Sequence, residues 1–174
     1  MGHQIRRMNM KKIVALLLTF LMALSLCACG EKPDQKVTTP KGDEKVCSKS
    51  LDAVYSAILP LIKDKDIMEI DAERITELYN IPTEDVKEAY IASFTIADAA
   101  FPGEVVLVEA SSEDKVSEIV ELLRTRLADI KAQAESYDPV SSKLADECTI
   151  EVSGTKIAYF FADNHAEMSE LFFN

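Results

Sequence analysis

The strongest constraint on the fold is a strand of the buried type that leads directly into a long amphipathic helix. Residues 104–110 are almost continuously apolar, a pattern typical of a strand at the centre of a sheet. Beyond them, apolar side chains recur every three or four positions, at Val116, Ile119, Val120, Leu123, Leu127, Ile130 and Ala134. One face of this helix must therefore lie on the sheet that contains the strand.

The start of the long helix carries a signal of its own. Ser111 and Asp114 have the spacing of a capping box, and acidic residues in a first turn suit the helix dipole. We therefore expect Ser111 to cap a helix that continues to about Glu135. A coiled-coil seam is the alternative, but the repeat covers three heptads at most and strands flank it.

Shorter patterns predict the other elements. Helical spacing of apolar residues is found in residues 51–62 after the capping residue Ser50, in residues 71–79 with a further turn at 83–88, and in residues 164–173. Strand patterns are found in residues 90–96, 149–152 and 156–161. The last two strands should form a hairpin across Ser153 and Gly154, in which the glycine supplies a positive φ.

These elements predict one α+β domain over residues 47–174. Their order is ααββαββα, and the four strands suit a single, mainly antiparallel sheet. We expect the long helix to pack on one face of this sheet, and we expect the helices to cover mainly that face.

The first 28 residues contain an apolar run that ends near a cysteine. Residues 13–26 are apolar except for Thr19 and Ser25, and Arg6, Arg7, Lys11 and Lys12 precede them. The run has 14 residues, whereas a helix needs about 20 to cross a bilayer. It therefore has the composition of a secretory signal rather than of a membrane span.

This segment resembles a bacterial lipoprotein signal peptide that ends in a lipobox, Leu26-Cys27-Ala28-Cys29. The resemblance implies cleavage after Ala28 and a diacylglyceryl group, with palmitate-like chains, on Cys29. Two acyl chains hold a protein stably at a bilayer where one is marginal. Cys27 fits less well because the large Leu26 precedes it. An ordinary secretory peptide or an uncleaved signal anchor would also begin with a basic segment and an apolar run.

After Cys29 the chain changes in composition. Residues 29–46 carry many charges and two prolines, so we expect a lipidated cysteine followed by a flexible polar tether. From Cys29 onward there are 15 basic and 30 acidic residues, a net charge of −15. Such a charge repels nucleic acid and anionic lipid head groups, so a phosphate-binding role has no support.

Residues for catalysis or metal binding are sparse. His165 is the only histidine after the signal segment, and neither a catalytic triad nor a metal site is expected. No cofactor motif is recognised. Cys47 and Cys148 are candidates for a disulfide in an exported chain, and two buried free thiols are the alternative.

Aromatic and proline residues in two loops are the candidates for an interaction surface: Phe101 and Pro102, with Tyr137 and Pro139. An aromatic side chain on a loop can bind a partner. It can also fold back to close the end of the core, and both interpretations stay open.

Several landmarks resemble those of a family of small, uncharacterised Gram-positive lipoproteins of clostridia-like bacteria, which carry a domain of unknown function. The landmarks are the segment 78–81 before acidic residues, Glu104, Gln133, Tyr137, Pro139 and Gly154. This chain has Thr155-Lys156-Ile157 where the family usually has an aromatic residue soon after the glycine. The resemblance implies an envelope lipoprotein and supplies no mechanism.

Three classes of function follow from these observations. The first is a non-enzymatic interaction or accessory module, held at the outer face of the cytoplasmic membrane through acylated Cys29, with an envelope protein as partner. The second is a small-ligand-binding lipoprotein, which needs a concave pocket. The third is an envelope enzyme, which needs carboxylates with perturbed pKa in a cleft.

Overall fold

The computed structural model describes residues 37–38 and 46–174. In this part of the chain, five antiparallel strands form a sheet in the order β5-β6-β4-β3-β2, and the two-residue β1 pairs with β5 in parallel. The strands are β1 (Val37–Thr38), β2 (Met68–Ile70), β3 (Val86–Phe94), β4 (Gly103–Ala110), β5 (Ile150–Ser153) and β6 (Lys156–Phe161). The prediction of an α+β domain with a mainly antiparallel sheet is confirmed, and the strand count of four is corrected.

The described residues also form five α-helices. They are α2 (Leu51–Ile62), α3 (Ile75–Tyr79), α4 (Glu113–Ala134), α5 (Pro139–Glu147) and α6 (His165–Phe173). Short 3-10 turns at 72–74 and 83–85 precede α3 and β3. None of the helices in the described segments is long and apolar enough to cross a bilayer.

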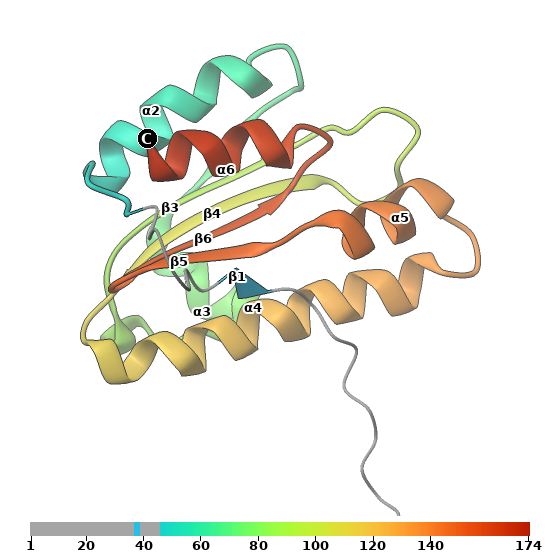
Figure 1. Cartoon of the computed structure of the whole chain (residues 1–174). Coiled ribbons are helices and arrows are strands. Elements are labelled where there is room, and N and C mark those ends of the chain that lie inside the picture. Colours follow the sequence, from blue (N-terminus) through green and yellow to red (C-terminus); the bar gives the residue numbers. More distant parts are fainter. Residues whose placement is uncertain (1–36, 39–45) are drawn as a thin grey trace, which may run out of the picture. The chain divides into compact units, whose positions relative to one another are not determined.

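Helices cover both faces of the sheet (Figure 1). α2 and α6 pack together on one face, whereas α4 packs on the other with α5 and α3 beside it. The long helix therefore packs as predicted, but the expectation that one face carries most of the cover is wrong. The reason is visible in β4, whose side chains are almost all buried and so must meet cover on both sides.

β4 lies between β6 and β3, as its apolar sequence predicts. Successive side chains of a strand point to opposite faces. Glu104 meets Arg126 of α4, so the face of Glu104 is the α4 face. Leu107 points to the opposite face. It is paired with Tyr90, whose ring contacts that of Tyr55 of α2, so this is the face that α2 covers.

The sequence predicted two helix caps, at Ser50 and Ser111, and one turn, at Gly154. The Ser50 cap and the turn are confirmed. Ser50 caps α2 by accepting a hydrogen bond from the backbone N–H of Ala53 at 3.3 Å, and Gly154 takes a φ of 59° in the β5–β6 hairpin. The predicted cap of α4 is wrong by one residue, because Ser112 rather than Ser111 occupies the cap position.

Besides the two-residue β1, two elements were not predicted. β2 has only three residues, too few for a recognisable alternation, and becomes a strand because the edge of β3 is available for pairing. α5 falls in a stretch that was expected to be irregular. Its signal was the pair Asp138-Pro139, since an acidic N-cap followed by proline is a common helix start.

Gly103 is required where β3 and β4 lie against each other. A Cβ atom at Gly103 would lie 2.2 Å from Cε2 of Phe94, its partner in the strand register. Phe94 is 2 % exposed, so its ring cannot simply turn into solvent. The absence of a side chain at Gly103 thus lets the Phe94 ring lie over the start of β4.

We expect Gly103→Ala to lower the free energy of unfolding by about 2 kcal/mol, because it overpacks a buried contact. Urea denaturation of the full chain measures this change. The matched background is Phe94→Leu, in which the same substitution should cost clearly less. An equal cost in both backgrounds would show that the Phe94 ring is not the cause.

Candidate functional site

The loop between β3 and β4 comes together with the segment before α5. The Phe101 and Tyr137 rings stack with their centroids 6.5 Å apart and their planes inclined by 30°. Tyr137 is 63 % exposed, and Pro102 and Pro139 are exposed beside this pair. The structure therefore brings together the two segments that the sequence analysis proposed as an interaction surface.

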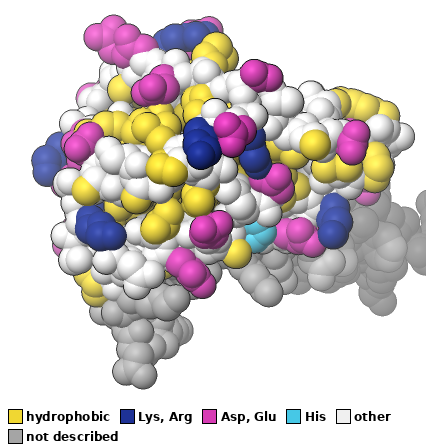
Figure 2. All heavy atoms as spheres, turned by 90° about the horizontal axis from the view of Figure 1, so that it is seen from above, with side chains coloured by type: hydrophobic (Ala, Val, Ile, Leu, Met, Phe, Trp, Pro, Cys, Tyr) yellow, Lys and Arg dark blue, Asp and Glu magenta, His cyan; other side chains and the backbone are white. Residues whose placement is uncertain are grey.

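We call this feature the loop surface and define it by Phe101, Pro102, Tyr137, Pro139 and Val140. Val140, at the start of α5, adds an exposed apolar side chain that the sequence analysis did not select. Figure 2 shows hydrophobic side chains among acidic and basic ones on the face seen from above Figure 1, including its right-hand end over α5. Hydrophobic groups are thus exposed at this end of the domain.

A buried carboxylate holds the two halves of the loop surface in place. Asp138 accepts hydrogen bonds from the backbone N–H groups of Ala100 at 2.7 Å and Ser141 at 3.0 Å. The first bond fixes the β3–β4 loop and the second caps α5. Asp138 thereby binds a residue that is 38 positions away in the sequence, a role that was not predicted from its sequence neighbours.

The electrostatics of Asp138 reflect these bonds. Burial alone raises the pKa of a carboxyl group, since the charged form loses hydration. Here, hydrogen bonds from Ser141 and from the backbone at Ala100 and Phe101 outweigh burial and lower the pKa of Asp138 to about 2. The ionised form is therefore the one that the folded protein stabilises.

A second buried carboxylate supports the other end of the loop. Glu104, the residue after Gly103, accepts hydrogen bonds from two of the three Arg126 guanidinium nitrogens, Nη2 and, at 3.4 Å, Nε. The Glu104 side chain is 5 % exposed and that of Arg126 33 %. Burial, followed by the negative charge of Glu104, raises the pKa of Tyr79 well above its ordinary value.

Tyr159 completes this cluster from β6. Its hydroxyl has no hydrogen-bond partner among the described residues. Burial first, and then the charge of Glu104, raises the pKa of Tyr159 well above its ordinary value. The cluster lies between the sheet and α4 and holds the start of β4 to that helix.

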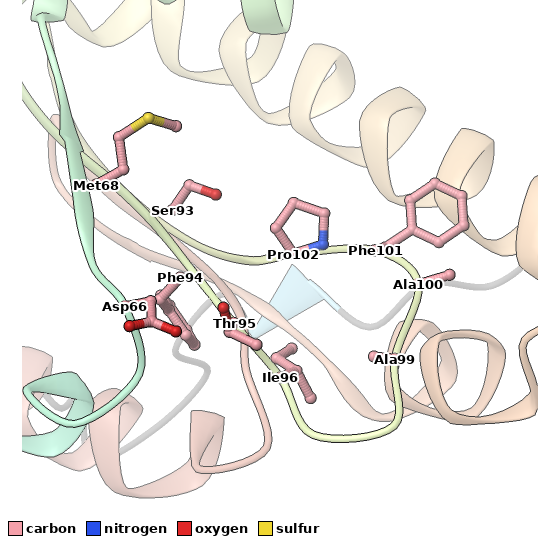
Figure 3. A pocket seen from close by; sticks show the side chains of 10 residues that line it. All are labelled: Asp66, Met68, Ser93, Phe94, Thr95, Ile96, Ala99, Ala100, Phe101 and Pro102. Carbon is pink, nitrogen blue, oxygen red and sulfur yellow. The ribbon is translucent and has the colours of Figure 1, made fainter.

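Two pockets lie beside the β3–β4 loop and share Ile96 as a wall. The first has a volume of about 410 Å³ and is lined by residues of the β2 and β3 segments and of the loop (Figure 3). The second, of about 420 Å³, is lined mainly by α5, including Val140 and Leu144. Volumes of this size suit a small molecule or a few side chains of a partner.

Cys47 and Cys148 are both free, buried thiols. The backbone N–H of Cys47 donates to Ser153 Oγ at the end of β5, whereas Cys148 precedes the start of that strand. Five residues of extended chain span about 16 Å, and a disulfide needs Cα atoms closer than about 7 Å. The structure thus favours the free-thiol alternative over a disulfide.

The two thiols differ in their surroundings. Burial raises the pKa of Cys148 to about 12. Burial also raises the pKa of Cys47, although the positive charge of Lys156 opposes this effect. Both shifts disfavour the thiolate, the reactive form of cysteine.

Two further questions from the sequence concern lipidation and metal binding. Cys29, the signal segment and most of the tether lie outside the described residues; within the tether, the structure describes Val37 and Thr38, as β1, and Val46. In the segments that the structure does describe, His, Cys, Asp and Glu side chains form no group of three that could hold a metal ion.

Comparison with known proteins gives one match. A family model described as a domain of unknown function, DUF4358, matches residues 61–162, which is more than half of the chain. The matched span includes β2 to β6 and the whole loop surface, but not α6. No curated protein and no solved structure matches the chain.

Proposed function

Since this chain belongs to the DUF4358 family, whose domain has no known function, we propose that it is a non-enzymatic interaction module of the cell envelope. It binds another envelope protein through the loop surface, and it is held at the outer face of the cytoplasmic membrane by acylated Cys29. The observation that carries the proposal is the stacking of exposed Tyr137 on half-buried Phe101, in loops that buried Asp138 holds together.

The chemistry of the loop surface supports a binding role. Tyrosine and phenylalanine contribute large contact areas at interfaces while losing little conformational freedom. The Phe101 segment is already fixed by the hydrogen bond from Ala100 to Asp138. A fixed surface loses less entropy on association than a mobile loop does.

The proposed location rests on the sequence alone. The apolar run of residues 13–26 and the segment 26–29 match a lipoprotein signal, which motivates a lipid on Cys29. The acidic charge of −15 after that point disfavours nucleic acid and anionic lipid surfaces as partners. A protein partner on the outer face fits both observations.

A small-ligand-binding lipoprotein is the second candidate. The pocket of about 410 Å³ beside β2 and β3 favours it, because such volumes are usual for ligand sites. This function predicts that a small molecule from the medium or cell wall copurifies with the protein. The interaction module predicts a protein partner instead.

We expect a photoreactive phenylalanine analogue at Tyr137 to form a crosslink to an envelope protein on intact cells. The same analogue at Thr125, which is exposed on α4, is the matched control and should form no such product. Mass spectrometry identifies the captured protein. Equal products at both positions, or none at Tyr137, would remove the proposed interaction role.

The same experiment in a Cys29→Ala background tests the location. Without the acyl group, the protein should leave the membrane fraction, and the crosslink at Tyr137 should be lost or strongly reduced. Retention of Cys29→Ala in the membrane would contradict lipidation at this residue.

A further inference from the structure

The pocket of about 410 Å³ lies at a corner of the sheet, where β2 and β3 run into the β3–β4 loop (Figure 3). The strand register pairs Met68 with Ser93, and beyond it the backbone N–H of Thr95 donates to the carbonyl oxygen of Lys65 at 2.7 Å. The lining of the pocket includes one carboxylate and two hydroxyl groups, those of Asp66, Ser93 and Thr95.

The polar groups of the pocket have no partners in the part of the chain that the structure describes. Among residues 37–38 and 46–174, the side chains of Asp66, Ser93 and Thr95 make no hydrogen bond or ion pair. Asp66 also adopts the left-handed conformation, with a φ of 49°. Its carboxylate is thus an acceptor that the fold itself does not use.

The adjacent cation is already paired. Lys65 forms a salt bridge with Asp163, and its Nζ lies 5.5 Å from the centroid of the Phe94 ring. Phe94 also lines the pocket, so this paired ammonium lies near one wall of it. Because Lys65 pairs with Asp163, the carboxylate of Asp66 has no ion-pair partner within the described part of the chain.

The remaining lining is apolar. Met68, Phe101 and Pro102 supply hydrophobic surface around the polar corner. One carboxylate and two hydroxyl groups are too few for a calcium site, which takes six to eight oxygen ligands. A positively charged group on an apolar stem fits this combination better, since the stem covers the hydrophobic walls while its end meets Asp66.

The second pocket does not offer the same chemistry. Its charged residues are already paired, Lys143 with Glu147 and Asp163 with Lys65. The rest of its lining, including Pro139, Val140 and Leu144, is apolar. A cationic group is therefore attracted to the Asp66 pocket and not to its neighbour.

We propose that the Asp66 pocket receives a primary ammonium group on an apolar stem, the chemistry of a lysine side chain presented by the protein that binds the loop surface. This assignment rests on the proposed interaction role and names the partner group that the role requires. Phe101 and Pro102 belong to both the pocket and the loop surface, so one partner segment contacts both.

The test uses the full chain and three small probes: Nα-acetyl-lysine methylamide, its norleucine analogue without the charge, and the glutamate analogue. The signal of the Met68 methyl group, measured by NMR with labelled methionine, reports occupation of the pocket. We expect only the lysine probe to shift this signal in a saturable way, with weak affinity.

Asp66→Asn should weaken the lysine probe about fivefold, the factor typical of one solvent-accessible ion pair. Asp64→Asn removes the same charge two residues away and outside the pocket, and it should leave the affinity unchanged. Binding of norleucine as tight as that of lysine would overturn the proposal. An equal loss of lysine-probe affinity in Asp66→Asn and Asp64→Asn would also overturn it. Such a result would show that the probe responds only to the overall negative charge of the protein.

The two proposals can fail separately. If the lysine probe binds but Tyr137 captures no envelope protein, the interaction role is wrong and the chemistry of the pocket stands. If Tyr137 captures a protein but Asp66→Asn changes neither that capture nor probe binding, the interaction role stands and the lysine assignment is wrong.

Discussion

Arg126→Met should lower the free energy of unfolding by about 3 kcal/mol, the largest loss that we expect from one substitution. Removal of one partner from a buried ion pair leaves the other charge without compensation and costs about 3–5 kcal/mol. Water reaches Arg126, whose side chain is 33 % exposed, so the lower end of that range applies. Methionine keeps most of the packing of the arginine stem. Urea denaturation at about pH 7 measures the difference.

A double variant separates the charge effect from packing. Adding Glu104→Gln to Arg126→Met should recover part of the lost stability, because a neutral amide costs less to bury than an unpaired carboxylate. A deficit that is not reduced in the double variant would point to packing alone.

Asp138→Ala should lower the free energy of unfolding by a similar amount, about 2–3 kcal/mol. The substitution removes the acceptor for the N–H groups of Ala100 and Ser141, and hydrogen bonds to a charged group contribute about 1.5–3 kcal/mol. It also removes the cap of α5. Hydrogen exchange at Ala100 should become faster, and the photo-crosslink from Tyr137 should weaken.

The sign of the pH effect follows from the lowered pKa of Asp138, which is about 2 in the folded protein and about 3.9 in an unfolded chain. A group whose pKa is lowered by folding stabilises the protein fully above its unfolded pKa. That contribution is lost as the pH falls through the folded value. The stabilities of the native protein and Asp138→Ala should therefore converge between about pH 4 and pH 2.

A matched acidic residue controls for the change in net charge. Asp129 is exposed on α4, and Asp129→Ala should change the stability by less than about 0.5 kcal/mol. An effect of Asp138→Ala no larger than that of Asp129→Ala would mean that the Asp138 bonds do not hold the loop.

Elements with strong local signals were predictable from the sequence. The apolar strand β4 and the 3.6-residue repeat of α4 each lie within one window of the chain, and the fold places them as expected. The same holds for the Ser50 cap and for Gly154, where a single residue type satisfies the local backbone. Such features depend only on neighbours in sequence.

The candidate site was only partly predictable. Phe101 and Tyr137 could be selected because large aromatic residues in polar loops are conspicuous. Asp66 and Asp138 could not, because the chain contains 30 acidic residues and nothing local distinguishes these two. Their roles depend on which segments face them in the folded protein.

By itself, the sequence determined the α+β class, most of the helices and strands, and the lipoprotein-like segment that motivates the proposed location. Only the tertiary structure decided that both faces of the sheet are covered, that Cys47 and Cys148 lie at opposite ends of β5, and that Asp138 joins the two halves of the loop surface. The physical reason is range. Propensity and periodicity act between residues a few positions apart, whereas burial, hydrogen bonds and uncompensated charge arise from segments that meet only when the chain is folded.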